Sequence, residues 1–381
     1  MAYFDNAATT FPKPESVYVF MDKFYRQCGG NAGRGTYENA ITASALIQDT
    51  RHKIKQLFHT TTKQVIFTPS ATIALNMIIQ GILQTDIRNV YISPFEHNAV
   101  TRILHDYENQ GKIKVFQLSV NSDFCLDLER IKYQFDAHKP DMVIVSHASN
   151  VFGVILPVTQ LFTLSKEYNA ITLVDMAQTA GLVDCDLNLS IFDFAVFAGH
   201  KTLYAPTGIA GFLMKQDCTL PAVLFGGTGF DSANQDMPNN LPERYEMGTQ
   251  NISGIAGLNA SLQWIQEVGI ETLWEKEQEH RQQLLDILSN YSFIKPIGIN
   301  QQNEYVGIVS CLIDGIPSDT AGTIFSQQCI SVRTGLQCAP LAHQYLGTYP
   351  AGTIRFSTSY FTSAEDFQQL ITALDYIEDN L

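Results

Sequence analysis

Short apolar stretches recur along the first part of the chain, separated by longer segments in which apolar residues return with helical spacing. A continuous apolar run of roughly four to eight residues is typical of a strand buried on both faces of a sheet. The alternation of such runs with helical patterns predicts an α/β fold whose mostly parallel, seven-stranded sheet carries helices on both faces. The predicted strands are Val65–Thr68, Asn89–Ser93, Lys114–Leu118, Asp141–Ser146, Ile171–Val174, Phe192–Phe197 and Ala210–Met214.

Two helices are predicted before the first strand, at Glu15–Gln27 and Tyr37–Leu57. The second is expected to bury an apolar stripe, because apolar residues recur along it. That stripe consists of Ile41, Ala45, Leu46 and Ile54. A third helix is expected to begin at Ser70-Ala71-Thr72, since serine and threonine are favoured N-cap residues.

The pattern changes after the last of these strands. Gly226–Tyr245 is polar and rich in turn-forming residues, which predicts a long excursion over the surface. Two helices follow, and the remainder of the chain mixes short strands with helices in an α+β pattern. We therefore predict a large domain at residues 16–254 and a smaller α+β domain made of residues 1–15 and 255–381. The elements expected in the last part are helices from Asn251 to about Glu267, Glu271–Ser289, Ser318–Gln327 and Ala364–Asp379, and strands Ile308–Leu312 and Thr353–Phe356.

The composition limits the classes of protein to consider. With 45% hydrophobic and 16% charged residues, the chain of 381 residues is typical of a soluble globular protein. The net charge of −14 and the lack of a basic cluster argue against nucleic acid or a membrane as partner. No apolar run is long enough to span a bilayer, and the opening MAYFDNAATT lacks the regions of a secretory signal.

The seven cysteines are odd in number and scattered, without a CxxC motif. This pattern predicts reduced thiols, a cytoplasmic location and no zinc site. Cys338 and His343 do not make a metal site without two further ligands.

Lys201 and Asp175 each follow a predicted buried strand, which is where ligands of open α/β sheets bind. A lysine amine can form a Schiff base with the aldehyde of pyridoxal 5′-phosphate (PLP), and a carboxylate can keep its pyridine nitrogen protonated. The two residues therefore favour PLP as cofactor; a solvated lysine and a helix-capping aspartate remain the structural alternative. Neither a GxGxxG after a strand nor a GxxxxGK[ST] supports a different cofactor.

Four further polar residues stand at strand ends or helix starts. Thr72 opens a helix, whose free N–H groups can hold a phosphate, although it could be an ordinary N-cap residue. His97 could lie against a cofactor ring or move protons, or be a hydrogen-bonded structural histidine. The amides of Asn150 and Gln178 could bind a ring oxygen or a carboxylate, with turn and cap roles as the alternative.

A thiol and three arginines complete the candidates. In RTGLQC, Arg333 and Cys338 stand five residues apart on a loop, which could favour a reactive thiolate. Arg355 lies in a predicted strand and could bind a substrate carboxylate. Arg34 lies in the glycine-rich segment CGGNAGRGT, where backbone can approach a ligand closely. The alternatives are an inert thiol for Cys338, a surface ion pair for Arg355 and a plain flexible loop for the segment that contains Arg34.

A series of motifs extends over nearly the whole chain. In order they are NAATT, NAGRG, EHN, SHASNVFG, VDMAQTAG, GHK, GGTG, ERYEMGT, RTGLQC and IRFS. Together they resemble the class V aminotransferase family of PLP fold type I, and within it the cysteine desulfurases and selenocysteine lyases. Two positions depart from the family pattern: Ala198 stands where a hydroxyl residue is frequent, and Thr72-Ile73-Ala74 stands where Thr-Glu-Ala is usual.

The resemblance implies how a cofactor would be held. Lys201 would be the Schiff-base lysine, Asp175 would pair with the pyridine nitrogen, and Gln178 would bond the ring hydroxyl. His97 would stack on the ring and assist with protons. The phosphate would be held by Thr72, by His200 and, in a homodimer, by Thr228 of the partner subunit.

It also implies how a substrate would be bound. Arg355 would bind the carboxylate, and Asn150 would contact both cofactor and substrate. Arg34 would handle substrate as well, with Arg333 close to the thiol. Cys338 would be the nucleophile.

The function that these roles imply is that of a PLP-dependent cysteine desulfurase, which converts L-cysteine to L-alanine and passes the sulfur to Cys338 as a persulfide. A protein could then accept the sulfur. Two alternatives stay open. One is a selenocysteine lyase, or another class V lyase or transaminase in which Cys338 is idle; the other is a PLP-binding sulfur-carrier or regulatory protein with little turnover.

Overall fold

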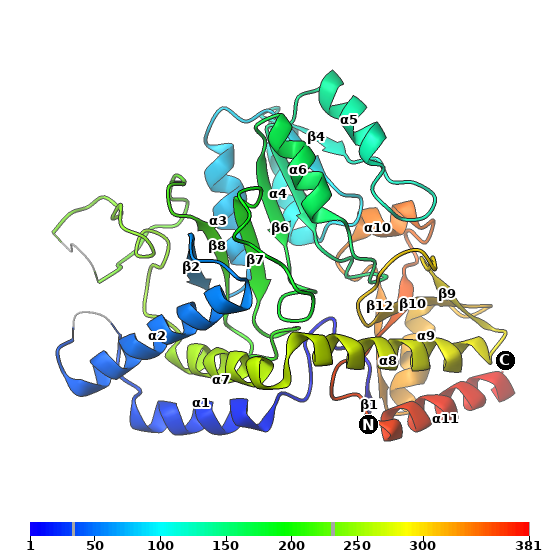
Figure 1. Cartoon of the computed structure of the whole chain (residues 1–381). Helices are drawn as coiled ribbons and strands as arrows, with labels where there is room; N and C mark the ends of the chain where they lie inside the picture. Colours follow the sequence, from blue (N-terminus) through cyan, green and yellow to red (C-terminus); the bar gives the residue numbers. More distant parts are fainter. Residues whose placement is uncertain (33–34, 230–232, 381) are drawn as a thin grey trace.

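The computed structural model describes residues 1–32, 35–229 and 233–380, whose elements are shown in Figure 1. All seven strands expected from the apolar runs form, and in this described part they make one seven-stranded sheet. Its order is β2-β8-β7-β6-β5-β3-β4, with β8 antiparallel to both neighbours and every other pair parallel. The prediction of a mostly parallel sheet is therefore confirmed. The strands are β2 (Lys63–Thr68), β3 (Asn89–Ile92), β4 (Lys114–Gln117), β5 (Met142–Ser146), β6 (Ile171–Asp175), β7 (Phe194–Ala198) and β8 (Ala210–Lys215).

Helices cover both faces of this sheet, because successive side chains of a strand point to opposite sides and both sets are apolar here. Ile66 and Val196 share one core with α3 (Ala71–Leu83) and α4 (Asn98–Asn109). Phe67 and Phe197, one residue further along, belong to the core on the other face. The helices of that second layer are α2 (Glu38–Leu57), α5 (Leu128–Ala137), α6 (Val158–Glu167) and α7 (Ile252–Val268), with α1 (Glu15–Gln27) packed against α7.

The apolar stripe expected on α2 is wrong in part. Leu46 and Ile54 are buried as predicted, but Ala45 is exposed and Ile41 is 57% exposed. A helix turns by about 100° per residue, so Ile41 and Ala45 lie on the side opposite to Leu46 and Ile54. The buried face is completed instead by Ala43, Ile47 and Thr50.

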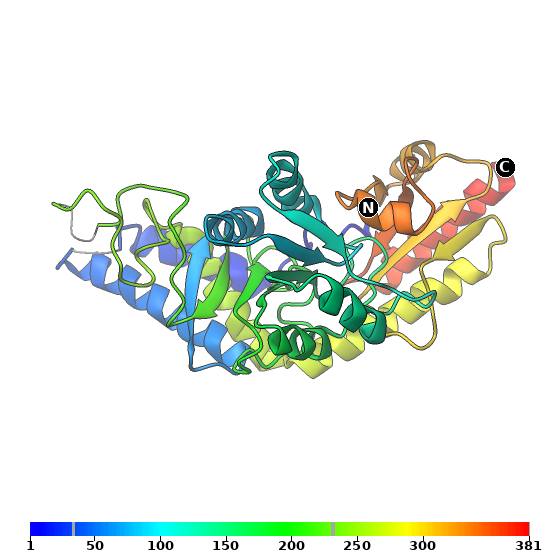
Figure 2. The same cartoon turned by 90° about the horizontal axis from the view of Figure 1, so that it is seen from above.

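A second sheet lies at one end of the molecule, next to the C-terminus (Figure 2). It is antiparallel, with the order β12-β13-β10-β9, and its core contains Phe325 and Phe356. Two strands of this sheet and two further elements of this part of the chain were not predicted, because each is only two to six residues long: β9, β12, β11 and α10. The elements are β9 (Ile294–Ile297), β10 (Ile308–Ile313), β11 (Ile330–Ser331), β12 (Arg333–Gly335), β13 (Thr353–Ser357), α8 (Ile270–Ser289), α9 (Ser318–Gln327), α10 (Pro340–Tyr345) and α11 (Ala364–Asn380).

The N-terminus joins this second part. β1 (Ala2–Tyr3) pairs in parallel with β11, and Phe4 lies in the core formed by α8 and α11. The following residues then cross to the large sheet, where Thr10 bonds the backbone of Lys201. The division after residue 254 stays a prediction; α7 packs against α1 and α2, and α8 packs against β9 and β10.

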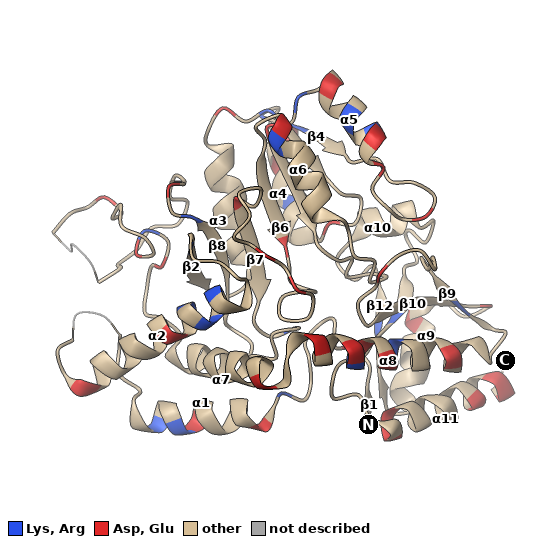
Figure 3. Ribbon diagram, in the orientation of Figure 1, with Lys and Arg blue, Asp and Glu red and all other residues tan. Residues whose placement is uncertain are grey.

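Charged side chains are unevenly placed on the surface. Acidic residues mark the outer helices α8 and α11, as Figure 3 shows. Among the helices that the structure describes, none is both long and apolar enough to cross a membrane.

Candidate active site

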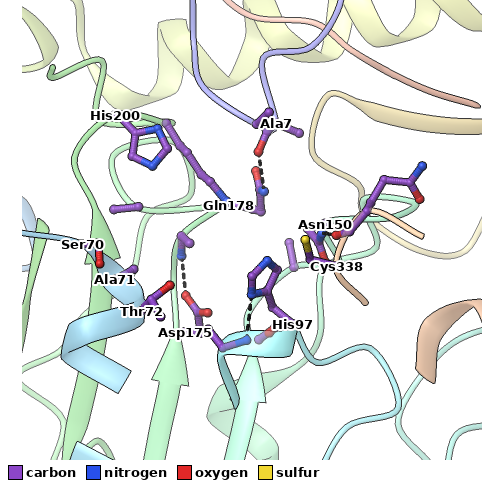
Figure 4. Close-up of a pocket in the computed structure, with 18 of the residues that line it drawn as sticks. Ala7, Ser70, Ala71, Thr72, His97, Asn150, Asp175, Gln178, His200 and Cys338 are labelled. Carbon is purple, nitrogen blue, oxygen red and sulfur yellow. Dashed lines mark hydrogen bonds between the residues drawn. The ribbon is translucent and has the colours of Figure 1, made fainter. Parts of the chain in front are cut away.

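A cavity of about 330 Å³ lies at the carboxyl ends of β5, β6 and β7, and the smaller sheet closes it from the opposite side. Figure 4 shows the side chains that point into it. Ten of the residues singled out from the sequence line this cavity: Thr72, His97, Asn150, Asp175, Gln178, His200, Lys201, Arg333, Cys338 and Arg355. Thr228 does not line the cavity of its own chain, and Arg34 lies outside the described residues.

The topology explains why Asp175 and Lys201 meet. Asp175 is the last residue of β6 and lies beside Val196 of β7. β7 ends two residues later at Ala198, and Gly199 and His200 then lead to Lys201. Neighbouring parallel strands end at one edge of a sheet, so both side chains enter the same space.

Burial shifts the pKa values of this pair in opposite directions. It lowers the pKa of the Lys201 amine to about 8, against the opposing effect of the Asp175 charge. It raises the pKa of Asp175, whose Oδ1 accepts a hydrogen bond from the backbone N–H of Ala177 at 2.9 Å. Burial destabilises the charged form of this carboxyl, and the hydrogen bond from Ala177 offsets that only in part. A cationic N–H donor placed beside the carboxylate would therefore stabilise it.

His97 is the N-cap residue of α4. Its Nδ1 accepts the backbone N–H of Ala99 at 3.0 Å (Figure 4). The neutral ring must therefore carry its proton on Nε2. Burial, together with the charges of Lys201 and Arg355, lowers the pKa of His97 to about 4, so the ring is neutral at neutral pH.

The start of α3 and the turn before Lys201 face each other across one end of the cavity. Ser70 caps α3 by accepting the N–H of Ile73 at 3.3 Å, and Thr72 follows in its first turn. His200 Nδ1 is buried and has no hydrogen-bond partner among the described residues. An unpaired buried nitrogen beside a helix N-terminus is the setting of an anion site.

The arginines at the other end are held by a residue that the sequence reasoning missed. Asp5 Oδ1 accepts from Arg355 Nη2 at 3.1 Å, and Asp5 Oδ2 accepts from Arg333 Nη2 at 2.8 Å. Arg355 is only 3% exposed, and its Nε has no partner among the described residues. Asp5 and Arg355 are 350 residues apart, so only the motif around Asp5 could have drawn attention to it.

Asn150 connects the arginine to the thiol loop. Arg355 Nη1 donates to the Asn150 carbonyl at 2.7 Å, and Asn150 Nδ2 donates to the Gln337 carbonyl at 2.6 Å. Cys338 comes next and is exposed at the mouth of the cavity. Its carbonyl accepts the N–H of Asn98 at 2.7 Å, so the loop is bonded to the start of α4 as well as to the turn after β5.

The side chain of Gln178 forms its hydrogen bond with the N-terminal segment. Its Nε2 donates to the Ala7 carbonyl at 3.0 Å, which leaves its Oε1 available to a ligand (Figure 4). Ala7, Ser70, Ser146 and Gln337 also line the cavity and were not predicted as site residues. Each lies beside a predicted one in space or in sequence, but none has a side chain whose chemistry stands out.

Comparison with known proteins gives a consistent result. The family model described as "Aminotransferase class-V" matches residues 2–370. A relative from Methanothermobacter thermautotrophicus named "Probable cysteine desulfurase" is 29% identical over 98% of this chain and 94% of its own. One from Haloferax volcanii named "Cysteine desulfurase" is 26% identical over 98% and 89%. The solved apo structure of a cysteine desulfurase from Thermococcus onnurineus superposes with a TM-score of 0.91 at 26% identity, covering 100% of this chain and 95% of that one.

The family match leaves out one residue at the N-terminus and eleven at the C-terminus. The chain belongs to the class V aminotransferase family. Members of this family are PLP-dependent enzymes. The seven-stranded sheet and the smaller sheet beside it are accordingly those of PLP fold type I, as the sequence predicted.

The cavity of this class V chain fits PLP. The unpaired Nδ1 of His200 and the N-terminus of α3 suit a phosphate. The raised pKa of Asp175 suits a protonated pyridine nitrogen, and the lowered pKa of Lys201 suits an amine that must react with an aldehyde. The family's hydroxyl is absent at Ala198; Ser70, the N-cap residue of α3, also lines the cavity and carries a hydroxyl.

Proposed function

We propose that this class V protein is a PLP-dependent cysteine desulfurase acting on L-cysteine. The observation that supports this best is that Lys201, Arg355 and Cys338 line one cavity. An amine for a carbonyl cofactor, a cation for a carboxylate and an exposed thiol are the three groups that this reaction needs. The names of the relatives agree with it.

Within this proposal, Lys201 would bond the cofactor, Asp175 would pair with its pyridine nitrogen, and Gln178 would bond its ring hydroxyl. The neutral ring of His97 would stack on the cofactor ring, and Asn150 would contact both cofactor and substrate. Thr72 and His200 would bind the phosphate together with Thr228 of the partner subunit, which would make the working unit a homodimer. PLP, when bound, withdraws electrons from the Cα of the amino acid and so allows its bonds to be broken.

The side chains of this chain account for the remaining chemistry. Arg355 binds the substrate carboxylate, and its unpaired Nε gives it a free donor for that purpose. The Lys201 amine takes the proton from Cα, for which a pKa of about 8 makes it a suitable base. The Cys338 thiolate attacks the substrate sulfur: an S–S bond forms, the substrate Cβ–S bond breaks, Cβ gains a proton, and Cα regains the proton that Lys201 took. L-cysteine and the thiol thus give L-alanine and a persulfide on Cys338.

Arg333 and Arg34 keep their predicted roles near the thiol and the substrate. The persulfide is exposed enough for a protein acceptor to reach it, since Cys338 itself is exposed. All seven cysteines are unpaired, which fits the prediction of a reducing, cytoplasmic location.

The decisive experiment measures alanine and sulfide released from L-cysteine with a reductant present. We expect both products from the wild type in equal amounts. Cys338→Ala should lose at least about 1,000-fold in rate, because no other exposed thiol lines the cavity in the described residues. Cys329→Ala removes the other exposed cysteine and should leave the rate unchanged.

Each contrary outcome points to a different protein. Equal rates for the wild type and Cys338→Ala would show a lyase in which the thiol is idle. PLP binding by equilibrium dialysis without turnover of cysteine would favour a carrier or regulatory protein. Turnover by Lys201→Ala would contradict any PLP mechanism of this kind.

A further inference from the structure

The turn that carries Cys338 has an unusual backbone. Gln337 has a φ of 40° and Cys338 a φ of 58°, so two consecutive residues with side chains lie in the left-handed region. Such residues are uncommon, and they persist where surrounding contacts fix them. The contacts around this turn therefore show what determines the position of the thiol.

The backbone of the turn is held by three hydrogen bonds. Asn150 Nδ2 donates to the Gln337 carbonyl at 2.6 Å, and the N–H of Asn98 donates to the Cys338 carbonyl at 2.7 Å. Within the turn, the N–H of Ala339 donates to the Leu336 carbonyl at 2.8 Å. The first two bonds attach the turn to the segment after β5 and to the start of α4.

The side chain of Gln337 attaches the turn to the smaller sheet. Gln337 Nε2 donates to the Thr353 carbonyl at 3.0 Å, and Gln337 Oε1 accepts from His343 Nε2 at 2.8 Å. Because a carbonyl only accepts, the amide nitrogen must face Thr353 and the amide oxygen must face His343. His343 consequently carries its proton on Nε2.

His343 extends this chain of hydrogen bonds. Its Nδ1 is then an acceptor, and Thr348 Oγ1 donates to it at 2.7 Å. The His343 ring is completely buried, and burial lowers its pKa to about 4, so it stays neutral at neutral pH. The hydrogen bonds run in one direction, from Thr348 through His343 and Gln337 to Thr353.

The far end of this chain lies on the strand that carries Arg355. Thr353 is two residues before Arg355 in β13, and β12 pairs with β13 so that Gly335 faces Thr353 and Arg333 faces Arg355. The turn with Cys338 and the strand with Arg355 are thus parts of one hydrogen-bonded unit. Their separation is set by that unit rather than by a free loop.

We propose that Gln337 and His343 are positioning residues which fix the distance between the Cys338 thiol and the Arg355 guanidinium, and thereby select amino acids of the length of cysteine. This rests on the proposed function, in which Arg355 binds the carboxylate and Cys338 attacks the sulfur. When the carboxylate is bound by Arg355, a substrate with one more methylene holds its sulfur at a different distance from Arg355. A Cys338 thiol in a fixed position is then wrongly placed to attack that sulfur. Discrimination by one methylene typically amounts to about 10- to 200-fold.

The test compares L-cysteine with L-homocysteine as substrate of Gln337→Met, which keeps the length of the side chain but removes its hydrogen bonds to His343 and Thr353. For L-cysteine we expect kcat to fall about 10- to 100-fold, since a misplacement of about 1 Å can cost about 100-fold, while KM stays within about threefold. The ratio of kcat/KM for cysteine over homocysteine should fall at least about tenfold. Gln344→Ala, which truncates an exposed glutamine of the same helix α10, should match the wild type in both quantities.

A second readout needs neither cofactor nor turnover. In cofactor-free protein, the rate of alkylation of Cys338 by iodoacetamide is measured relative to that of Cys329, which is also exposed, by mass spectrometry of the peptides. Release of the turn should raise this ratio at least about threefold in Gln337→Met. Thr348→Val should change it in the same direction and by less, whereas Thr348→Ser retains the hydroxyl and should restore the wild-type ratio.

These measurements test the positioning role of Gln337 separately from the proposed desulfurase activity. A wild type that does not desulfurate cysteine would contradict the function, and the alkylation ratio would still decide whether Gln337 positions the thiol. Unchanged alkylation ratios in both Gln337→Met and Thr348→Val would overturn the positioning role. Altered alkylation with an unchanged preference for cysteine over homocysteine would overturn the selection by length.

Discussion

At the scale of single residues, the site depends on groups whose ionisation is set by burial. Lys201 is the main example, since burial lowers the pKa of its amine to about 8 and the Asp175 charge partly offsets this. An ordinary lysine has a pKa of about 10.4. Lys201 therefore has a much larger neutral fraction near pH 8 than a surface lysine, and only the neutral amine can bond an aldehyde or take up a proton.

We predict that modification of Lys201 by reductive methylation in the cofactor-free protein rises with pH to a midpoint near 8. In Asp175→Asn the midpoint should move to lower pH, because the charge that supports the protonated amine is lost. Mass spectrometry of the Lys201 peptide measures both. A midpoint above 10 in the wild type would show that burial does not lower the pKa of Lys201.

At the level of secondary-structure elements, the buried side chain of Glu96 connects the carboxyl ends of β3 and β5 by hydrogen bonds. Glu96 follows β3, and its Oε1 accepts from Ser93 Oγ at 2.5 Å and from the N–H of Ser146, the last residue of β5, at 2.7 Å. Its Oε2 accepts from Ser146 Oγ at 2.8 Å. Burial nevertheless raises the pKa of Glu96 to about 7, with a smaller contribution from the Asp175 charge.

This raised pKa predicts a pH dependence of stability. In the unfolded chain a glutamate titrates near 4.3, so between that value and about 7 the folded protein binds the proton more tightly. The contribution of Glu96 to the free energy of unfolding is therefore complete below about pH 4.3, and it is lost as the pH rises through 7. Against Glu96→Gln, which cannot ionise, the wild type should lose about 3 kcal/mol of unfolding free energy between pH 4.5 and 8.

Urea unfolding of the wild type and of Glu96→Gln at matched pH values measures the difference between their unfolding free energies. The other titrating groups are the same in both proteins, so their effects cancel in this difference. The hydrogen bonds to Ser146 can be kept by a glutamine, so the variant is expected to fold. A difference between the two proteins that does not change over this pH range would show that Glu96 is ionised throughout.

At the scale of the whole molecule, apolar side chains remain exposed on elements at the end away from the second sheet. Five of them are more than half exposed and belong to α1, α2, their connection or the segment after β8: Val19, Tyr25, Tyr37, Ile41 and Phe225. These elements lie at the same end in both Figure 1 and Figure 2. Exposed apolar residues gathered in this way are typical of an interface, and Phe225 is three residues from Thr228.

We predict that the protein is a dimer in sedimentation velocity and that Phe225→Glu or Ile41→Glu shifts it towards monomer. Loss of the dimer should also weaken PLP retention, because Thr228 of the partner subunit would no longer reach the phosphate. Tyr133→Glu alters a residue on α5 that is 75% exposed, and it should have no such effect. A wild type that sediments as a monomer and retains PLP fully would contradict this arrangement.

The strands of the large sheet and the polar residues at their ends could be predicted from the local pattern of the chain. Periodicity and apolar runs are local signals, and the run predicted as a strand at Phe192–Phe197 forms one with shifted ends, Phe194–Ala198. Asp175 and Lys201 could be found because parallel strands place their carboxyl ends together, whatever the details of packing. The stripe of α2 failed at Ile41 and Ala45 because apolar character alone does not say which side of a helix faces the core.

The contacts that hold the site residues in place form only in the folded chain. Asp5 bonds Arg333 and Arg355 from more than 300 residues away, and Asn150 bonds the backbone of Gln337 at 187 residues' distance. The sequence indicated a loop at Gln337, but not its hydrogen bonds to His343 and Thr353. Such contacts depend on distance and direction in space, which the residue types along a chain do not contain.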